Sequence, residues 1–238
     1  MSVDHNIYRN GTYRARNPDW HDGDGAWKAL QIGHLLRRNG IDPKSVCDVG
    51  CGTGRVLAEL AVQFPAAERL VGTDTSDEVL DAARGLSPRE IEFVNTEKLD
   101  QVEHFDLVLM VDLFEHIEDY LGFLRSFRGR ADRFVFHIPL DLSAQALLRV
   151  EPILHARRHV GHLHYFCRET ALATLDDAGY RVLDERYTPG ALELDRPGRR
   201  RAVARIPRKA AFRLSPHLTA RVLGGFSLLV LCDGGEMQ

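Results

Sequence analysis

The fold of this chain is decided by the stretch Val46-Cys47-Asp48-Val49-Gly50-Cys51-Gly52-Thr53-Gly54-Arg55. Its apolar start, 46–49, predicts a buried strand, and the three glycines predict a tight loop whose backbone a ligand can approach. Apolar residues then recur at helical spacing, which predicts a helix with one face on a sheet: they are Val56, Leu57, Leu60, Ala61 and Phe64. The N-terminus of that helix directs free N–H groups and the positive dipole end at the loop, so the unit suits an anionic or strongly polar ligand group.

The glycine spacing distinguishes two kinds of nucleotide-binding protein. A dinucleotide fingerprint is G-x-G-x-x-G, but Arg55 occupies the position of its third glycine. The loop, with Asp48 before it, resembles instead the first motif of class I S-adenosylmethionine-dependent methyltransferases. That resemblance implies that Asp48 lies near the amino-acid part of the cofactor. It also implies which loop residues the methionine moiety and ribose approach: Gly50, Cys51, Gly52 and Gly54.

Two further strand ends follow at distances that fit this cofactor. The second strand, 70–74, ends in Asp74, where a carboxylate can accept hydrogen bonds from both ribose hydroxyls. The alternative for Asp74 is a plain turn or cap residue. Thr75 follows it at the start of the next helix. The third strand, 91–95, leads into Thr96, where the resemblance implies a polar side chain beside the adenine.

The fourth strand, 105–111, is apolar almost throughout, as expected of a strand covered on both faces. The segment after it, 112–119, resembles the corresponding segment of small-molecule methyltransferases of the quinone-biosynthesis type. That resemblance adds Val111 and Asp112 to the expected cofactor contacts.

Alternating strands and helices predict an α/β fold, a doubly wound, mostly parallel, seven-stranded Rossmann-like sheet with the cofactor at the carboxyl ends of its strands. The other strands are expected at 133–139, 180–187 and 226–232, and a helix at 26–38. The methyltransferase domain is expected to span 26–238. Two inserts interrupt it, an apolar helical one at 142–158 that Pro152 breaks, and a basic helical one at 188–225.

Residues 1–25 are polar but rich in aromatic side chains. We expect this segment to fold over the cofactor cleft as a lid and to contribute Tyr8, Tyr13 and Trp20 to substrate binding. The alternative is an arm packed elsewhere on the domain.

The second insert is locally basic. Between 196 and 232 there are nine lysines and arginines and no acidic residue. These cations could clamp an anionic small-molecule substrate, hold an acidic partner, or form a solvated surface.

Histidines supply the expected chemistry. Methyl transfer is an in-line displacement, so a base is needed only where the acceptor must lose a proton. His116 follows the fourth strand and is the first candidate for that base, although it could instead orient Glu115. Other histidines are assigned by position, His162 and His164 to catalysis, and His137 and His159 to substrate binding. The spacing of 159, 162 and 164 could also converge on a cation, but no carboxylate or cysteine completes the set, so no metal is expected.

Charge, apolar segments and cysteine content indicate which partners and which cellular compartment to expect. The net charge of −3 over 238 residues gives no overall attraction to nucleic acid or membrane. There is no membrane span or signal-peptide core, and the four cysteines form no C-x-x-C pair, which together favour a cytoplasmic enzyme with reduced thiols. We expect methyl transfer from S-adenosylmethionine, yielding S-adenosylhomocysteine, to an oxygen or nitrogen of a small anionic or sugar-like metabolite. The alternatives are a cofactor-binding regulatory or RNA-interacting protein on this fold, or an RNA methyltransferase.

Overall fold

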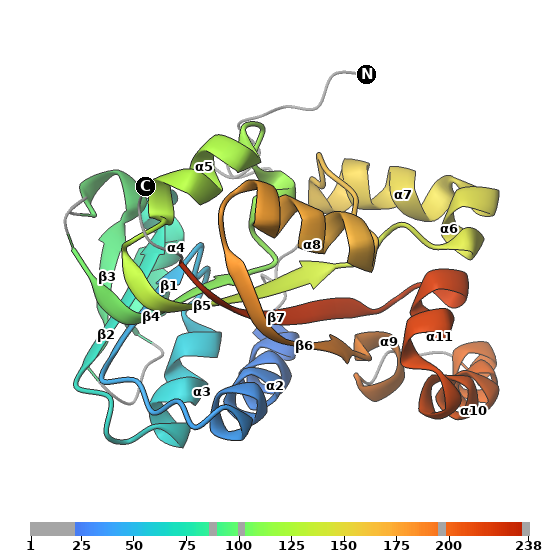
Figure 1. The fold of residues 1–238 in the computed structure, drawn as a ribbon, viewed down its shortest axis with the longest axis horizontal. Coiled ribbons are helices and arrows are strands. Elements are labelled where there is room, and N and C mark those ends of the chain that lie inside the picture. The colour runs from blue at the N-terminus through green and yellow to red at the C-terminus, as the bar shows by residue number, and fades with distance from the viewer. Residues whose placement is uncertain (1–21, 86–89, 100–102, 195–198, 235–238) are drawn as a thin grey trace.

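A computed structural model describes residues 22–85, 90–99, 103–194 and 199–234. Within these ranges seven strands form one sheet in the order β3-β2-β1-β4-β5-β7-β6 (Figure 1). Its neighbours are parallel except β7, which is antiparallel to both β5 and β6. The strands are β1 Ser45–Val49, β2 Arg69–Asp74, β3 Glu92–Asn95, β4 Phe105–Val111, β5 Ala131–Pro139, β6 Arg181–Thr188 and β7 Ser227–Asp233. The predicted fold class is confirmed, and the predicted strand ends agree within two residues.

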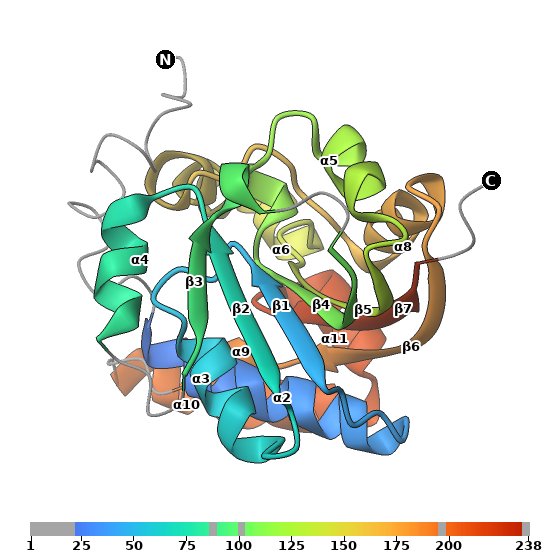
Figure 2. The ribbon, with the colours of Figure 1, turned by 90° about the vertical axis from the view of Figure 1, so that its left-hand side faces the viewer.

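Helices cover both faces of the sheet (Figure 2). On one face lie α2 Gly25–Arg38 and α3 Arg55–Gln63, and on the other α5 Tyr120–Phe127 and α8 Arg168–Asp177, while α4 Asp77–Arg84 packs beside β3. The central strands alternate between the two cores: Leu107 and Leu109 pack toward α2 and α3, and Val108 and Met110 pack toward α5 and α8. This double burial explains why β4 is apolar at nearly every position. Short 3-10 turns occupy Asp22–Asp24, Thr96–Lys98 and Phe114–His116.

The first insert is helical, but Pro152 does not break it as predicted. It forms α6 Ala144–Arg149 and α7 Glu151–His155, followed by a π-helical turn, Ala156–Val160. The break falls at Val150, which has a positive φ of 60°. Pro152 lies in the first turn of α7, where a missing N–H costs no intrahelical hydrogen bond.

The second insert contains α9 Gly190–Glu193, α10 Arg199–Leu214 and α11 Pro216–Leu223. These helices lie beyond the ends of β6 and β7, on the same side of the molecule as α6 and α7 (Figure 1). Phe212 of α10 stacks on Phe226 with 5.0 Å between ring centroids, which ties the insert to the start of β7. Among the described residues no helix is both long and apolar enough to cross a bilayer.

Gly54 is a loop glycine at which both the backbone conformation and the surrounding space disfavour a side chain. It has φ 73°, and an added Cβ would lie 2.6 Å from the Cζ atom of buried Phe93. We expect Gly54→Ala to lower the free energy of unfolding by about 2–4 kcal/mol, because a left-handed backbone cost adds to overpacking. Gly40→Ala is the control: Gly40 has φ 67°, but its Cβ would meet nothing within 4 Å, so we expect only about 1 kcal/mol. Urea unfolding measures both, and equal losses would contradict the steric explanation.

Candidate active site

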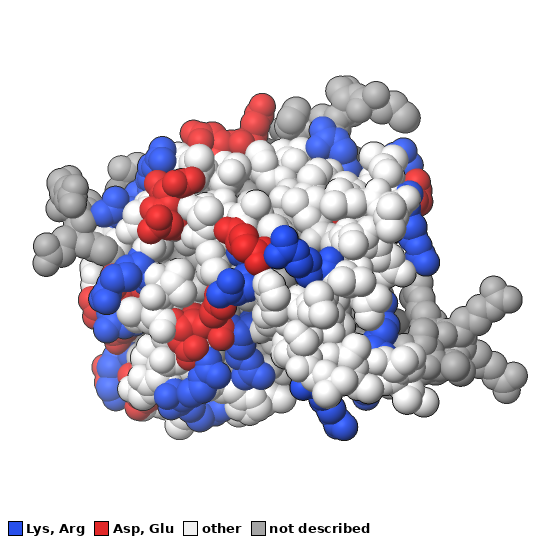
Figure 3. All heavy atoms as spheres, turned by 45° about the vertical axis from the view of Figure 1, so that its right-hand side comes forward, with Lys and Arg blue, Asp and Glu red and all other residues white. Residues whose placement is uncertain are grey.

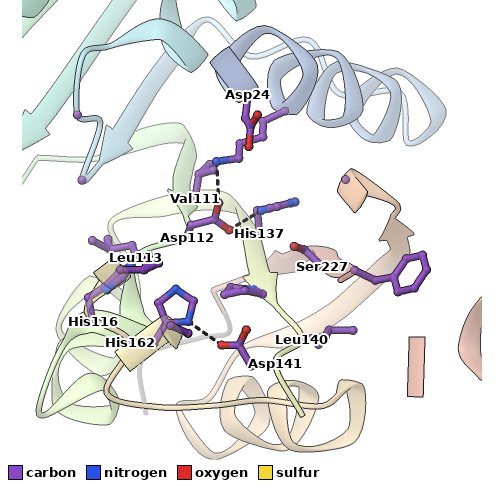
Figure 4. A pocket seen from close by; sticks show the side chains of 18 of the residues that line it. Asp24, Val111, Asp112, Leu113, His116, His137, Leu140, Asp141, His162 and Ser227 are labelled. Carbon is purple, nitrogen blue, oxygen red and sulfur yellow. Dashed lines mark hydrogen bonds and ion pairs between the residues drawn. The ribbon is translucent and has the colours of Figure 1, made fainter. Parts of the chain in front are cut away.

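A cavity of about 1060 Å³ opens at the carboxyl ends of β1, β2, β4 and β5 (Figure 4). The glycine loop and the strand ends form one part of its wall. Residues of the inserts, from α6, α7, α10 and the segment after α11, form another part. The glycine loop and the inserts thus line a single cavity.

At the glycine loop, hydrogen bonds fix the backbone against β2. The N–H groups of Gly50 and Cys51 both donate to the Thr73 carbonyl, at 2.7 and 2.8 Å. The Asp74 carboxylate accepts from Gly52 N at 3.1 Å and from Ser76 N at 3.0 Å. Each oxygen of Asp74 therefore accepts at least one backbone hydrogen bond, and the carboxylate keeps lone pairs for hydrogen bonds from a ligand.

Asp48 is a buried carboxylate in the wall of this cavity, and its Oδ1 atom has no hydrogen-bond partner. Burial and the nearby Asp74 raise the pKa of Asp48 to about 7. An unpartnered acid in this position complements a ligand ammonium. The cofactor of the predicted family carries such an ammonium, so this end of the cavity fits S-adenosylmethionine.

The raised pKa of Asp48 makes stability depend on pH. The folded chain holds the Asp48 proton up to about pH 7, whereas the unfolded chain releases it near pH 4. The contribution of Asp48 to the free energy of unfolding is therefore fully present below pH 4. It is lost as the pH rises to 7, and the loss is at most about 4 kcal/mol.

We expect Asp48→Asn to remove this loss, so that the variant gains on the native chain between pH 5 and pH 8. The same variant should bind S-adenosylmethionine more weakly, because an amide does not neutralise the ammonium. Chemical unfolding at several pH values measures the first effect, and calorimetry the second. Parallel stability curves for the two proteins would contradict the assignment.

Beyond the loop, Asp112 joins three elements. Its carboxylate lies 2.6 Å from His137 Nδ1 of β5 and 2.7 Å from Lys28 Nζ of α2 (Figure 4). Burial alone would raise the pKa of Asp112, but His137 and Lys28 hold it well below its usual range. His137 Nε2 lies 2.9 Å from Thr188 Oγ1 of β6. Both His137 nitrogens are thus engaged within the protein, and the ring holds the strand ends together.

Two histidines of the cavity wall, His116 and His162, pack edge to face against each other. The rings of His116 and His162 have centroids 4.9 Å apart. Asp141, just beyond β5, lies 2.6 Å from His162 Nδ1, so in the neutral ring Nδ1 donates and Nε2 remains as an acceptor (Figure 4). Burial and the proximity of His162 lower the pKa of His116 to about 4, so His116 is neutral at pH 7.

Glu115 completes this cluster. It is fully buried, neither carboxylate oxygen has a hydrogen-bond partner, and Oε1 lies 3.8 Å from His116 Nε2. Burial, with a contribution from Asp112, raises the pKa of Glu115 well above its usual value. One ligand atom from each of Glu115, His116 and His162 lies within 4.8 Å of the others, close enough to hold a cation.

The structure distributes the predicted site residues unevenly. Most of them line the cavity: Asp48, Gly50, Cys51, Gly52, Asp74, Thr75, Thr96, Val111, Asp112, His116, His137 and His162. Gly54 lies at the end of the loop, where it packs against Phe93 and is not part of the cavity wall. Tyr8, Tyr13 and Trp20, and with them almost all of the expected lid, lie outside the described residues.

Two predicted histidines lie away from the cavity wall. His164 donates from Nε2 to the Ile117 carbonyl at 2.9 Å and packs on Tyr120. His159 is exposed and stacks on His155. The histidines at 159, 162 and 164 form no metal-ligating group in the described part of the chain. His162 instead lies in a candidate metal-ligating group with His116 and Glu115, and Glu115 was not among the predicted site residues.

Sequence reasoning missed Lys28, Glu115, Asp141 and Thr188. Two of them carried a usable signal, because Glu115 precedes His116 directly and Asp141 follows the end of β5, where parallel strands present ligand contacts. Lys28 and Thr188 carried none, since their roles arise from contacts across more than 50 residues.

The sheet order, the glycine loop and the carboxylates at two neighbouring strand ends define a nucleotide-cofactor fold of the methyltransferase class. A family model described as a methyltransferase domain matches residues 20–185, and the chain belongs to the class I S-adenosylmethionine-dependent methyltransferases. S-adenosylmethionine is its cofactor, as the resemblance implied.

Named relatives share this domain. The chain is 29% identical over 151 residues to the ubiquinone biosynthesis O-methyltransferase of Actinobacillus pleuropneumoniae serotype 7, covering 55% of this chain and 63% of the relative. It is 32% identical over 154 residues to the enzyme of that name from Shewanella halifaxensis, covering 58% and 63%. The small RNA 2′-O-methyltransferase of Mus musculus is 32% identical over 93 residues, covering 32% and 23%. Each match spans less than two thirds of the relative.

Solved structures share the fold. The magnesium protoporphyrin IX methyltransferase of Synechocystis PCC 6803, with bound S-adenosylhomocysteine, superposes with a TM-score of 0.61 at 16% identity, covering 96% of each chain. The plantazolicin methyltransferase in complex with S-adenosylhomocysteine gives 0.59 at 15% identity, covering 96% of this chain and 93% of the other.

Proposed function

We propose that this protein transfers the methyl group of S-adenosylmethionine to an oxygen of a small molecule that enters the cavity. The observation that carries this proposal is that one cavity joins the glycine loop to the paired histidines. The names of the relatives, which methylate oxygen, support oxygen over nitrogen. The two inserts form part of the cavity wall, and this favours a small acceptor over RNA.

Each part of the cavity has a task in this proposal. Asp48 holds the cofactor ammonium, Asp74 accepts from the ribose hydroxyls, and Thr96 lies at the adenine side. When bound, S-adenosylmethionine supplies an electrophilic methyl group on a sulfonium. The protein then has to hold the acceptor oxygen in line with it and remove the proton of that oxygen.

His162 is the better of the two histidines for the proton. A base is most effective when its pKa lies near the working pH, and the pKa of His116 is lowered to about 4. The Asp141 carboxylate at His162 Nδ1 orients the ring and stabilises the imidazolium formed when Nε2 takes the proton. Neutral His116 then lies beside His162 as a hydrogen-bonding group.

A divalent cation is the second candidate for activating the acceptor oxygen. It is favoured by Glu115, because a fully buried carboxylate with two unpartnered oxygens is costly unless it is protonated or bound to a cation. A cation held by Glu115, His116 and His162 would lower the pKa of a bound hydroxyl and leave both histidines as ligands.

One assay tests both candidates. The protein is incubated with S-adenosylmethionine and a panel of hydroxylated and aminated carboxylates, sugars, sugar phosphates and short RNA, and S-adenosylhomocysteine release is measured. The experiment is run as purified, with EDTA, and with EDTA followed by excess Mg²⁺ or Mn²⁺. Release that EDTA leaves unchanged favours His162 as the base, whereas loss restored by the cation favours the metal. No release with any acceptor would overturn the proposed activity.

A further inference from the structure

Charge is divided between the two ends of the cavity. Its carboxylates, from Asp24, Asp48, Asp74, Asp112 and Asp141, lie at the strand ends and in the turn before α2. The one lysine and the one arginine that line this end are both paired with acids, Lys28 with Asp112 and Arg55 with Glu59. The insert end contributes basic side chains, from Arg149, His155 and Arg208.

Arg208 of α10 is held rigidly in this wall. Its Nη2 atom donates to the Gly224 carbonyl at 2.5 Å and to the Leu223 carbonyl at 3.3 Å, at the C-terminus of α11. The guanidinium also lies over the Phe226 ring, 5.8 Å from its centroid. The carbonyls and the ring therefore fix its orientation before any ligand arrives.

The cation has no counterion among the described residues. Its Nε atom is buried without a hydrogen-bond partner, and no carboxylate of the described chain lies close enough to raise its pKa. Arg208 is partly buried, and this partial loss of water lowers the pKa of its guanidinium, because no acid of the described chain offsets it. Because this guanidinium lies in the cavity wall without a carboxylate partner, an anion in the cavity gains a charge-assisted hydrogen bond from it that the protein leaves unmade.

Arg149 of α6 belongs to the same network. Gln145 connects Arg149 to Arg208. The Gln145 amide nitrogen faces the Leu223 carbonyl and donates to it at 2.7 Å, and the Gln145 amide oxygen accepts from Arg149 Nη2 at 3.2 Å. The Leu223 carbonyl is thus shared by Gln145 and Arg208. Two guanidinium groups from different inserts are thereby linked around one part of the cavity.

We propose that Arg208 and Arg149 form an anion subsite that receives a carboxylate or phosphate of the methyl acceptor. This inference rests on the proposed function and makes it more specific. The acceptor carries its anionic group at the insert end and its nucleophilic oxygen at the end with His116 and His162. The acids at the cofactor end repel the anion, so the charge division also disfavours the reversed orientation.

Figure 3 shows acidic side chains gathered mainly on the left half of this face, while the right half is largely uncharged apart from scattered lysines and arginines. The side of the molecule that carries the inserts therefore presents few acidic side chains.

Inorganic phosphate is the probe for the experiment, with S-adenosylhomocysteine at saturation. We expect phosphate to raise the melting temperature of the native chain relative to chloride at equal ionic strength. In Arg208→Gln the phosphate dissociation constant derived from these shifts should rise at least tenfold, because a charge-assisted hydrogen-bonding partner is lost. Phosphate should also protect Arg208 and Arg149, but not Arg213, from modification by phenylglyoxal, as read by peptide mass spectrometry.

Arg213→Gln is the matched control, since Arg213 lies exposed on the same helix and outside the cavity wall. Arg208→Lys keeps the charge without the fork and should bind phosphate more weakly than the native chain. An equal loss in Arg213→Gln, or native phosphate affinity in Arg208→Gln, would overturn the subsite. Calorimetry with S-adenosylhomocysteine distinguishes a failure of the subsite from a failure of the proposed function. If every variant binds S-adenosylhomocysteine as the native chain does, failure of the subsite leaves the proposed function standing. If the native chain does not bind S-adenosylhomocysteine, the proposed function itself fails.

Discussion

Replacing Asp74 by alanine is expected to lower the affinity for S-adenosylhomocysteine by at least 100-fold. The Asp74 carboxylate keeps acceptor capacity on both oxygens after binding Gly52 N and Ser76 N. Two charge-assisted hydrogen bonds to ribose hydroxyls contribute about 3–6 kcal/mol together, which corresponds to a factor of 10² or more. The variant also loses the contact that anchors the loop at Gly52. Isothermal titration calorimetry on the native chain and Asp74→Ala measures the effect.

The variant should remain folded. Burial raises the pKa of Asp74 even though backbone N–H groups oppose that rise, so the free carboxylate is a net cost to the folded chain. Asp81→Ala is the control, because Asp81 is an exposed acid on α4 that pairs only with Arg84 among the described residues. We expect Asp81→Ala to bind S-adenosylhomocysteine within twofold of the native chain. Undiminished binding by Asp74→Ala would show that Asp74 is a turn residue and that the ribose lies elsewhere.

Replacing His162 by glutamine is the second large change. With an acceptor identified in the panel, kcat should fall by about 10²–10⁴, the usual contribution of a positioned base. The affinity for S-adenosylhomocysteine should stay within threefold, because the contacts expected for the cofactor come from other residues. Asp141→Asn should lower kcat by a smaller factor, since it removes the group that orients His162 and keeps the base itself.

His104→Gln serves as the control, an exposed histidine before β4 that lies outside the cavity wall. The pH profile distinguishes a base from a ligand. If His162 is the base, the acid limb of kcat against pH disappears in His162→Gln, and Glu115→Gln retains most activity. If Glu115→Gln is as inactive as His162→Gln and neither responds to added cation, the cluster is a cation site. Native activity in His162→Gln would remove both explanations.

The sequence itself determined the fold and the cofactor end of the cavity. A strand, three glycines and a helix within 46–64 are local features, and each strand ends within two residues of the end that the pattern of apolar positions predicts. In a parallel sheet all carboxyl ends meet at one edge, so Asp48 and Asp74 had to lie near each other once both strands were identified. Both line the same cavity in the structure.

Sequence was less informative where contacts cross connections of irregular shape. Nothing local shows that His162 meets His116 and Glu115, because a distance of 46 residues is closed by a π-helical turn and a positive-φ glycine at 161. The break at Val150 was missed for the same kind of reason, since a helix with proline in its first turn looks broken at that proline.

Only the tertiary structure decided which of the many arginines line the cavity. The arginines of the second insert look alike in sequence, yet Arg208 is fixed on the carbonyls that end α11, while Arg213 of the same helix is exposed. Composition records charge but not burial, and the free energy of a charge depends on burial and pairing. The chain's sequence therefore determined its sheet, its glycine loop and the two acids at the ends of β1 and β2, because these are local features. The packing of the inserts decided the histidine cluster and the position of the unpaired guanidinium, because both arise from contacts between distant segments.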